Sequence, residues 1–375
     1  MLEPSQFRCR LAGAILLALA AAGPLFAAEV QADDPAVLSS EAMPLASQSL
    51  LLDITRTAAG LFVVGERGTV LRSSVDGTWK QLSVPTRATL TSAASAEGEL
   101  WVAGHSGVIL RSSDNGDTWV RQRIDLWNPE SVEPAQGAPL LDVLFLNAST
   151  GFAVGAFSTL LRTVNGGQTW ETLSLKGGAS IAQAEPMTDE VDEMAASALD
   201  SFYDSGVLSA DQLVLEDETD PHLNAIASDT AGTLYLAGER GAMYRSRNNG
   251  DTWQKLSLPY EGSMFGVLAG DVGEVMAFGL RGNVFESSDG GDSWSRLDTG
   301  TQVALMGGTA LAGGGVVLVG NEGVMLTRKD GASPFERTTY QNDAGETPVL
   351  SGVLAEESGG LILIGEKGVE RHGDR

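Results

Sequence analysis

The stretch RSSDNGDTWV, residues 111–120, contains two serines, two aspartates, an Asn, a Gly and a Trp. An Asp or Asn at the start of a tight turn accepts hydrogen bonds from backbone N–H groups further along it, and a following Gly takes the positive φ that the turn needs. The Trp can then open a strand and wedge its large flat side chain into a seam between sheets. The stretch therefore predicts a hairpin between two strands.

This hairpin belongs to a longer pattern, LWVAGHSGVILRSSDNGDTWVRQ, that begins at Leu100 and occurs seven times along the chain. One Gly anchors each copy: Gly65, Gly104, Gly155, Gly238, Gly279, Gly320 and Gly365. The steps between these glycines are 39, 51, 83, 41, 41 and 45 residues. A period near 41 with several short strands per unit is typical of a propeller blade.

Each unit reads as four short strands separated by turns rich in Gly, Asn and Asp, as in RATLTSAAS, ELWVAG, GVILRSS and TWVRQR of the second copy. The sequence predicts an all-β fold, a seven-bladed β-propeller over residues 29–375. The last unit has no room after GVERHGDR, residues 368–375, for a fourth strand. Because an open seam exposes a strand edge, we expect Ala36–Ala42 to supply that strand.

The first 28 residues have the pattern of a secretory signal peptide, with two arginines, an apolar run over 11–22 and a small-residue end. Cleavage is expected after Ala27 or Ala28, with an uncleaved anchor as the alternative. The chain is therefore expected outside the cytoplasm, in the periplasm, or in the thylakoid lumen of a photosynthetic host. Cys9 is the one cysteine and lies in the signal, which excludes disulfides and thiolate metal sites from the mature chain. A net charge of −25 makes nucleic acid and anionic membranes poor partners.

The hairpin pattern S-x-D-x-G-x-T-W resembles the Asp-box, or bacterial neuraminidase repeat, of many propellers. Its expected role is a structural clasp on the outer rim, with cation binding or sugar stacking as the alternative. The residues assigned to the clasps are Asp114, Gly116, Trp119, Asn165, Trp170, Asn248, Trp253, Asp289 and Trp294.

The turn between the second and third strands of each blade is the candidate binding region. Three units share the form G-[EL]-R-G, so Arg67, Arg240 and Arg281 are expected at like positions on one face. With Glu66, Glu239 and Lys367 they form a candidate partner-binding surface for a carboxylate-bearing chain. The alternative is a solvated ring of charges that compensate one another.

The step of 83 residues contains an insertion at about residues 175–221 that is rich in Asp and Glu. Apolar residues at helical spacing between Val191 and Phe202 predict an amphipathic acidic helix between blades 3 and 4. We expect it to emerge on the face of the Arg turns, either packed flat on the propeller or as a displaceable cap over a partner site.

Sialidases are also Asp-box propellers, and they need an arginine cluster, a Tyr nucleophile and an acidic Asp at the centre. The expected inner strands here contain Arg56 and Arg87 but no Tyr. Asp53 and Asp142 are placed to line the channel, where an inward carboxylate is more often a hydrogen-bonded strand partner. We therefore expect no catalytic residues, no metal and no cofactor, and keep a sialidase-like or glycan-binding propeller as the alternative.

Repeats such as VGERGTVLRSS over residues 64–74 make the chain similar to the photosystem II stability and assembly factor family. The resemblance implies a secreted seven-bladed propeller without catalysis that uses an arginine-rich face, here Arg67, Arg240 and Arg281. It further implies an assembly factor or docking scaffold for a membrane protein complex exposed to the periplasm or lumen. A monomer is expected.

Overall fold

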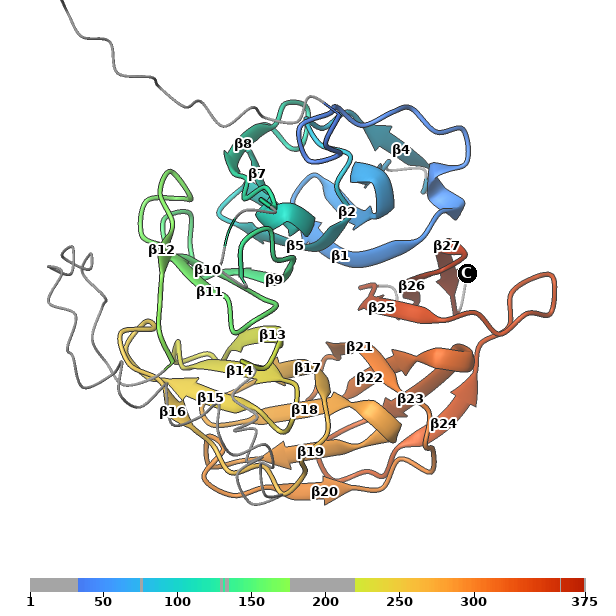
Figure 1. Ribbon diagram of the computed structural model, residues 1–375. Coiled ribbons are helices and arrows are strands. Elements are labelled where there is room, and N and C mark those ends of the chain that lie inside the picture. The colour runs from blue at the N-terminus through green and yellow to red at the C-terminus, as the bar shows by residue number, and fades with distance from the viewer. Residues whose placement is uncertain are drawn as a thin grey trace, which may run out of the picture.

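A computed structural model describes residues 33–74, 77–128, 131, 135–175, 220–357 and 359–373. Seven antiparallel sheets stand in a ring, and each is built from strands consecutive in sequence (Figure 1). The predicted seven-bladed propeller is confirmed. The predicted acidic helix and signal peptide lie outside the described residues, except for the two ends of the insertion.

Blades 1 to 3 each have four strands, numbered outward from the centre. They are β1 (Leu51–Thr57), β2 (Gly60–Gly65), β3 (Thr69–Ser73) and β4 (Trp79–Leu82); β5 (Leu90–Ala96), β6 (Glu99–Gly104), β7 (Ile109–Ser112) and β8 (Val120–Arg123); and β9 (Leu140–Phe145), β10 (Gly151–Gly155), β11 (Leu160–Thr163) and β12 (Glu171–Thr172).

Blades 4 to 6 repeat this order and blade 7 has three strands. They are β13 (Leu223–Ser228), β14 (Leu234–Gly238), β15 (Met243–Ser246) and β16 (Gln254–Lys255); β17 (Met264–Ala269), β18 (Val275–Gly279), β19 (Val284–Ser287) and β20 (Ser295–Leu297); β21 (Leu305–Ala310), β22 (Val316–Gly320), β23 (Val324–Arg328) and β24 (Glu336–Thr339); and β25 (Leu350–Ala355), β26 (Leu361–Gly365) and β27 (Gly368–His372).

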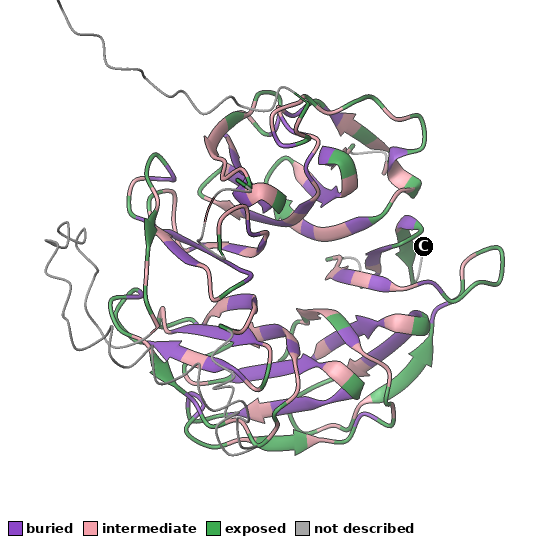
Figure 2. Cartoon of the chain, viewed as in Figure 1, coloured by how far each residue is buried: buried purple, intermediate pink, exposed green. Residues whose placement is uncertain are grey.

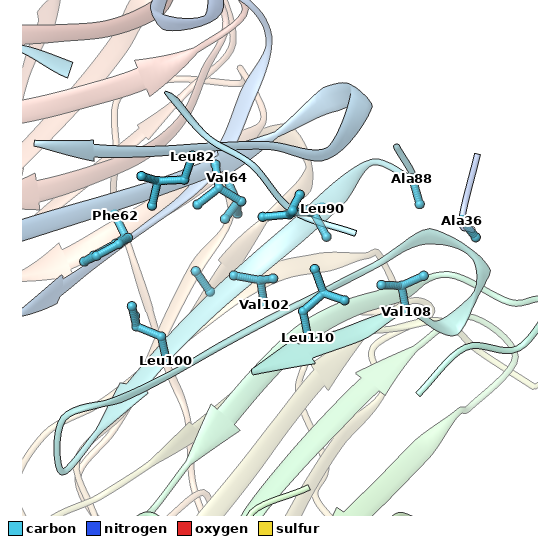
Figure 3. Close-up of a cluster of buried hydrophobic side chains, with 13 residues drawn as sticks. Ala36, Phe62, Val64, Leu82, Ala88, Leu90, Leu100, Val102, Val108 and Leu110 are labelled. Atoms are coloured by element: carbon cyan, nitrogen blue, oxygen red, sulfur yellow. The ribbon is translucent and has the colours of Figure 1, made fainter. Parts of the chain in front are cut away.

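The core lies in the seams between neighbouring blades rather than in one central mass. Between blades 1 and 2, Phe62 and Val64 of β2 face Leu90, Val102 and Leu110 of blade 2 (Figure 3). Second strands such as β10, β14 and β18 are buried at every residue because a blade covers each of their faces. The outermost strands β20 and β24 are largely exposed (Figure 2). Within the described part of the chain, no helix is long and apolar enough to cross a membrane.

The first strand of every blade bulges at the same place. In blade 1 the pairing with β2 skips from Leu51 to Asp53, and the other blades skip the equivalent residue. A bulge re-aims the side chain that follows it. In all seven blades that following residue lines the central channel: Asp53, Ser92, Asp142, Ala225, Gly266, Gly307 and Gly352.

The expectation that Ala36–Ala42 forms the outer strand of blade 7 is wrong. Ala36 is fully buried in the seam between blades 1 and 2. Ser40 N donates to Val84 O at 2.9 Å, and Gln81 Nε2 donates to Glu41 O at 2.9 Å. Apolar burial and these bonds hold the segment against the outer end of blade 1. Blade 7 therefore has three strands among the described residues.

The short helix η1 (Ala46–Gln48) leads the chain from this segment into β1. Ala46 and Met43 pack with Ile362 and Ile364 in the seam between blades 7 and 1. Arg56 of β1 and Ser351 of β25 add hydrogen bonds across the same seam, to Ala355 O and Leu51 O. The ring is closed by side chains rather than by a shared sheet.

Candidate functional site

The turns between second and third strands have the same backbone conformation in most blades. Short 3-10 turns, η2 (Glu66–Gly68), η3 (His105–Gly107), η4 (Leu280–Gly282) and η5 (Asn321–Gly323), occupy this position in blades 1, 2, 5 and 6. The central residue of each has a left-handed φ between 54° and 57°, as does Arg240 of blade 4. This conformation is uncommon for residues other than Gly. Arg67, Arg240 and Arg281 thus sit at equivalent positions, and all three are exposed.

Connections between blades run along the same face as these turns. Asp125 N, in the connection after blade 2, donates to Ser106 O at 2.8 Å. Ser158 N, in the turn of blade 3, donates to Pro221 O at 3.0 Å. The chain therefore re-enters the described structure after residue 219 beside the turns that carry the arginines.

Three other predicted site residues on this face have structural contacts. Glu66 Oε1 accepts a hydrogen bond from Leu50 N at 3.3 Å, and Glu239 Oε2 accepts one from His222 N at 3.2 Å. Both carboxylates thus brace the segment that enters their own blade. Lys367 pairs with Glu346 at 3.2 Å.

The connection from blade 4 to blade 5 bonds to the turns of both Arg240 and Arg281, through Gly262 and Tyr260. The hydroxyl of Tyr260 donates to Leu280 O at 3.3 Å, next to Arg281. Gly241, next to Arg240, donates its N–H to Gly262 O at 3.0 Å. The connection from blade 4 to blade 5 therefore holds both turns. Sequence reasoning did not single out Tyr260, because nothing in the repeat marks it.

The Asp-box hairpins are closed by their own side chains. Asp114 Oδ1 accepts from Thr118 N at 2.8 Å, and Gly116 N donates to Ser112 Oγ at 2.8 Å. Trp119 Nε1 donates to Gly116 O at 3.0 Å. Hydrogen bonds from the Thr118 hydroxyl and N–H lower the pKa of Asp114 to about 2. The same main-chain pattern recurs around Asn165, Asn248 and Asp289, with Trp170, Trp253 and Trp294 packed in the adjoining seams.

The clasps of blades 2, 4 and 5 also bind an arginine of the preceding blade, whereas Arg111 of blade 2 pairs with Glu99 of its own blade. Arg72 Nη1 of blade 1 donates to Asn115 O of the next clasp at 2.7 Å and to Asp117 at 2.9 Å. Arg162 of blade 3 reaches Asn249 O at 2.9 Å, and Arg245 of blade 4 pairs with Asp292 at 2.9 Å. This arginine contact between blades, here called the latch, is visible in the sequence as the Arg of the LRSS pattern, but its partner lies 45 residues away for Arg72 and 87 residues away for Arg162.

Blade 5 reverses the polarity of the latch. Glu286 replaces the Arg, and Arg328 of blade 6 reaches back to it with Nη1–Oε1 and Nη2–Oε2 distances of 2.8 and 3.2 Å. The acidic residue of the contact is thus in blade 5 and the basic residue in blade 6, but the two blades are still joined by an ion pair.

The central channel contains two carboxyl groups joined by one hydroxyl. Ser92 Oγ lies 3.1 Å from Asp53 Oδ2 and 2.8 Å from Asp142 Oδ1. Asp53 also accepts from Ala93 N of blade 2, and Asp142 from Ile226 N of blade 4. The predicted channel position of both residues is confirmed, and both are bonded to strands of neighbouring blades. Desolvation raises the pKa of Asp142 to about 6, and desolvation with the nearby Asp142 charge raises that of Asp53 to about 7.

Among the residues that the structure describes, the channel does not contain the groups that sialidase chemistry requires. Its cavity is about 250 Å³, and its lining, among the described residues, includes no Tyr and no Arg. Arg56 donates to Ala355 O, and Arg87 pairs with Glu41 at 2.7 Å. The two carboxyls are occupied by backbone N–H groups rather than open to a sugar.

These features define a seven-bladed propeller with Asp-box clasps. Residues 33–135 match the family model described as "Photosynthesis system II assembly factor YCF48". The resemblance seen in the repeats is thereby confirmed for this stretch, which covers blades 1 and 2. A comparison with curated proteins finds no match.

Solved propellers share the fold at low identity. "YCF48 bound to D1 peptide" is 14% identical with a TM-score of 0.60, covering 89% of this chain and 97% of that chain. "YCF48 from Cyanidioschyzon merolae" is 18% identical with a TM-score of 0.60, covering 88% and 96%. "Streptogramin B lyase structure" is 13% identical with a TM-score of 0.64, covering 87% and 94%. At such identities the likeness concerns the fold alone, so function must be argued from the site.

Proposed function

We propose that the chain is a non-enzymatic propeller, related to the photosystem II assembly factors, that holds a protein partner on the turn face of Arg67, Arg240 and Arg281. The observation that carries this proposal is the placement of three exposed arginines at equivalent turn positions, all in the left-handed conformation. A Gly would adopt that conformation at lower cost. The presence of Arg in three of these turns therefore favours a role for the guanidinium groups outside the fold.

The chemistry of the face suits a carboxylate-bearing segment. Guanidinium groups bind carboxylates through two parallel hydrogen bonds, which gives orientation as well as affinity. In a chain of net charge −25, the three guanidinium groups are local points of attraction for an acidic peptide on this face. The match of residues 33–135 and the likeness to a YCF48 bound to a peptide support a protein as the partner.

The pattern of residues 1–28 supports secretion to the periplasm or lumen, and the family resemblance supports a membrane protein complex as the client. The propeller acts as a monomer in this proposal, and it assists assembly or stability rather than a reaction.

A photo-crosslinking residue at the exposed position Glu366, on the turn of blade 7, tests the proposal in the native host. The triple variant Arg67→Asn, Arg240→Asn, Arg281→Asn removes the guanidinium groups with a residue that tolerates left-handed φ. We expect the crosslinked membrane protein, identified by mass spectrometry, to decrease at least about tenfold, equivalent to about 1.4 kcal/mol.

The matched control exchanges three exposed cations on fourth strands, Lys80→Asn, Lys255→Asn and Arg296→Asn. It changes net charge equally and should leave the crosslink intact. Equal loss in both variants would reduce the effect to bulk charge and refute the docking face. Binding of a glycan in an array, lost in the first variant alone, would instead assign the face to carbohydrate.

A further inference from the structure

In blades 1 to 6 a fourth strand pairs with the third, whereas no described strand pairs with the outer side of β27, whose first residues Gly368 and Val369 pack against η1 and Met43. Glu370, Arg371 and His372 are exposed, although the third strands of the other blades are mostly buried. A strand edge with unpaired N–H and C=O groups is a template for another extended chain.

The six complete blades show what such a chain would look like. In blade 1, β4 places Trp79 opposite Ser73, Gln81 opposite Leu71 and Leu82 opposite Val70. The fourth strands of blades 4 and 5 read WQKL and WSRL over 253–256 and 294–297. Their third residue is basic and lies opposite the position equivalent to Leu71. Blades 4 and 5 thus share the form aromatic, polar, basic, aliphatic, and blades 2 and 6 keep the basic residue at the same position, as Arg121 and Arg337.

Blade 7 differs from this template at one position. Its register places Glu370 opposite Leu363, as Leu71 lies opposite Val63 in blade 1. The equivalent third-strand residue is Leu, Tyr or Phe in the six other blades, so Glu370 is the only acid there. Glu370 borders a small hollow in the seam with blade 6, together with Tyr340, Leu350 and Leu363.

We propose that the outer edge of β27 docks an extended basic segment of a partner protein, which completes blade 7 as its fourth strand with the sequence aromatic–polar–basic–aliphatic. The backbone edge supplies the main-chain hydrogen bonds. The basic side chain pairs with Glu370 across the strands, and the aromatic side chain packs opposite His372 toward the seam with blade 6. A basic segment also suits the net charge of −25. The proposal is independent of the arginine turns.

Two labelled peptides probe the edge by fluorescence anisotropy with the whole chain. The first, TWQKLSL, has the sequence of residues 252–258, and the second, TWQELSL, replaces its basic residue with an acid. We expect saturable binding of the first and about three- to tenfold weaker binding of the second, since an opposed charge pair is exchanged for like charges. Alternate N–H groups of a strand point to opposite edges. Methylation of the peptide nitrogens that face β27 should therefore abolish binding, and methylation of those that face away should leave it unchanged.

The variant Glu370→Lys should reverse the preference between the two peptides. Glu370 is exposed, so this change leaves the fold intact. Glu261→Lys, an equal charge change at another exposed site, is the matched control and should bind like the unaltered chain. The triple Arg→Asn variant of the turn face should also bind normally, which separates this edge from the proposed partner face.

The proposal would be overturned if no saturable binding is found, or if neither Glu370→Lys nor methylation alters the binding. The charged residues of β27 would then be explained as a means of preventing an exposed edge from pairing with other chains. Binding that appears only after residues 1–32 are removed would overturn it too, because this chain would then fill its own edge. A dimer dissociated by TWQKLSL would assign the edge to a second copy, which also contradicts the proposal.

Discussion

Asp53 of blade 1 and Asp142 of blade 3 are joined across blade 2 by the single hydroxyl of Ser92. A hydroxyl has one hydrogen, so Ser92 can donate to one carboxyl only. Ser92 Oγ also accepts from Val143 N at 3.2 Å. The arrangement is satisfied when a protonated Asp53 donates to Ser92 and Ser92 donates to an ionised Asp142. The higher pKa of Asp53 agrees with this order.

This pair predicts that thermal stability falls as pH rises from 5 to 8. In the folded chain the pKa values of Asp53 and Asp142 are about 7 and 6, above the ordinary value of 3.8. Between pH 4 and 7 the folded state therefore binds more protons than the unfolded state, and its stability is lost as pH passes through this range. We expect the melting temperature measured by calorimetry to be about 2–4 °C lower at pH 8 than at pH 5.

The variant Asp53→Ala, which copies Ala225 of blade 4, identifies the group responsible. It should lower the melting temperature at pH 5 and flatten the decline between pH 6 and 8. Below pH 4 it should still lose stability, because Asp114 has its pKa lowered to about 2 and its bonds are lost as pH falls. A variant that declines in parallel with the unaltered chain would exclude the channel pair as the cause.

The latch between blades predicts a large effect of Arg245→Ala. Arg245 is 3% exposed, donates to Gly290 O and pairs with Asp292 of the next clasp. Truncation leaves a buried carbonyl and a carboxylate without their donor, which costs about 2–4 kcal/mol of unfolding free energy. Urea denaturation measures it. The exposed Arg296 is the control, and Arg296→Ala should cost less than about 0.5 kcal/mol.

The reversed latch predicts a rescue between blades 5 and 6. Glu286→Arg places a second guanidinium beside Arg328, which is 4% exposed, and should destabilise the chain by about 2–3 kcal/mol. Adding Arg328→Ser recreates the Arg and Ser of the ordinary repeat in neighbouring blades, as at Arg72 of blade 1 and Ser112 of blade 2. The double variant should recover more than half of the loss. Additive losses in a double-mutant cycle would show that the two residues do not act as one contact.

The blades, their strands and the clasps could be predicted from sequence because each depends on residues near one another in the repeat. Asp114 bonds to Thr118, and Gly65 anchors a turn within one blade. The latches, the Ser92 bridge and the role of Tyr260 join different blades, so the repeat alone does not reveal their partners. The same holds for Ala36–Ala42: the repeat indicates a missing fourth strand in blade 7, but contacts between blades decide that Ala36 is buried in the seam between blades 1 and 2.

Substitutions of Arg67 distinguish a role of its guanidinium group in folding from a role in partner binding. Arg67 has a φ of 54°, a conformation that costs a residue with a Cβ about 1 kcal/mol and that Gly adopts freely. Arg67→Gly should therefore melt at or slightly above the temperature of the unaltered chain, while Arg67→Val melts lower because a β-branched residue is strained there. If Arg67→Gly clearly destabilises the chain, the guanidinium contributes to folding. Partner binding would then no longer be needed to explain why Arg, rather than Gly, occupies this turn.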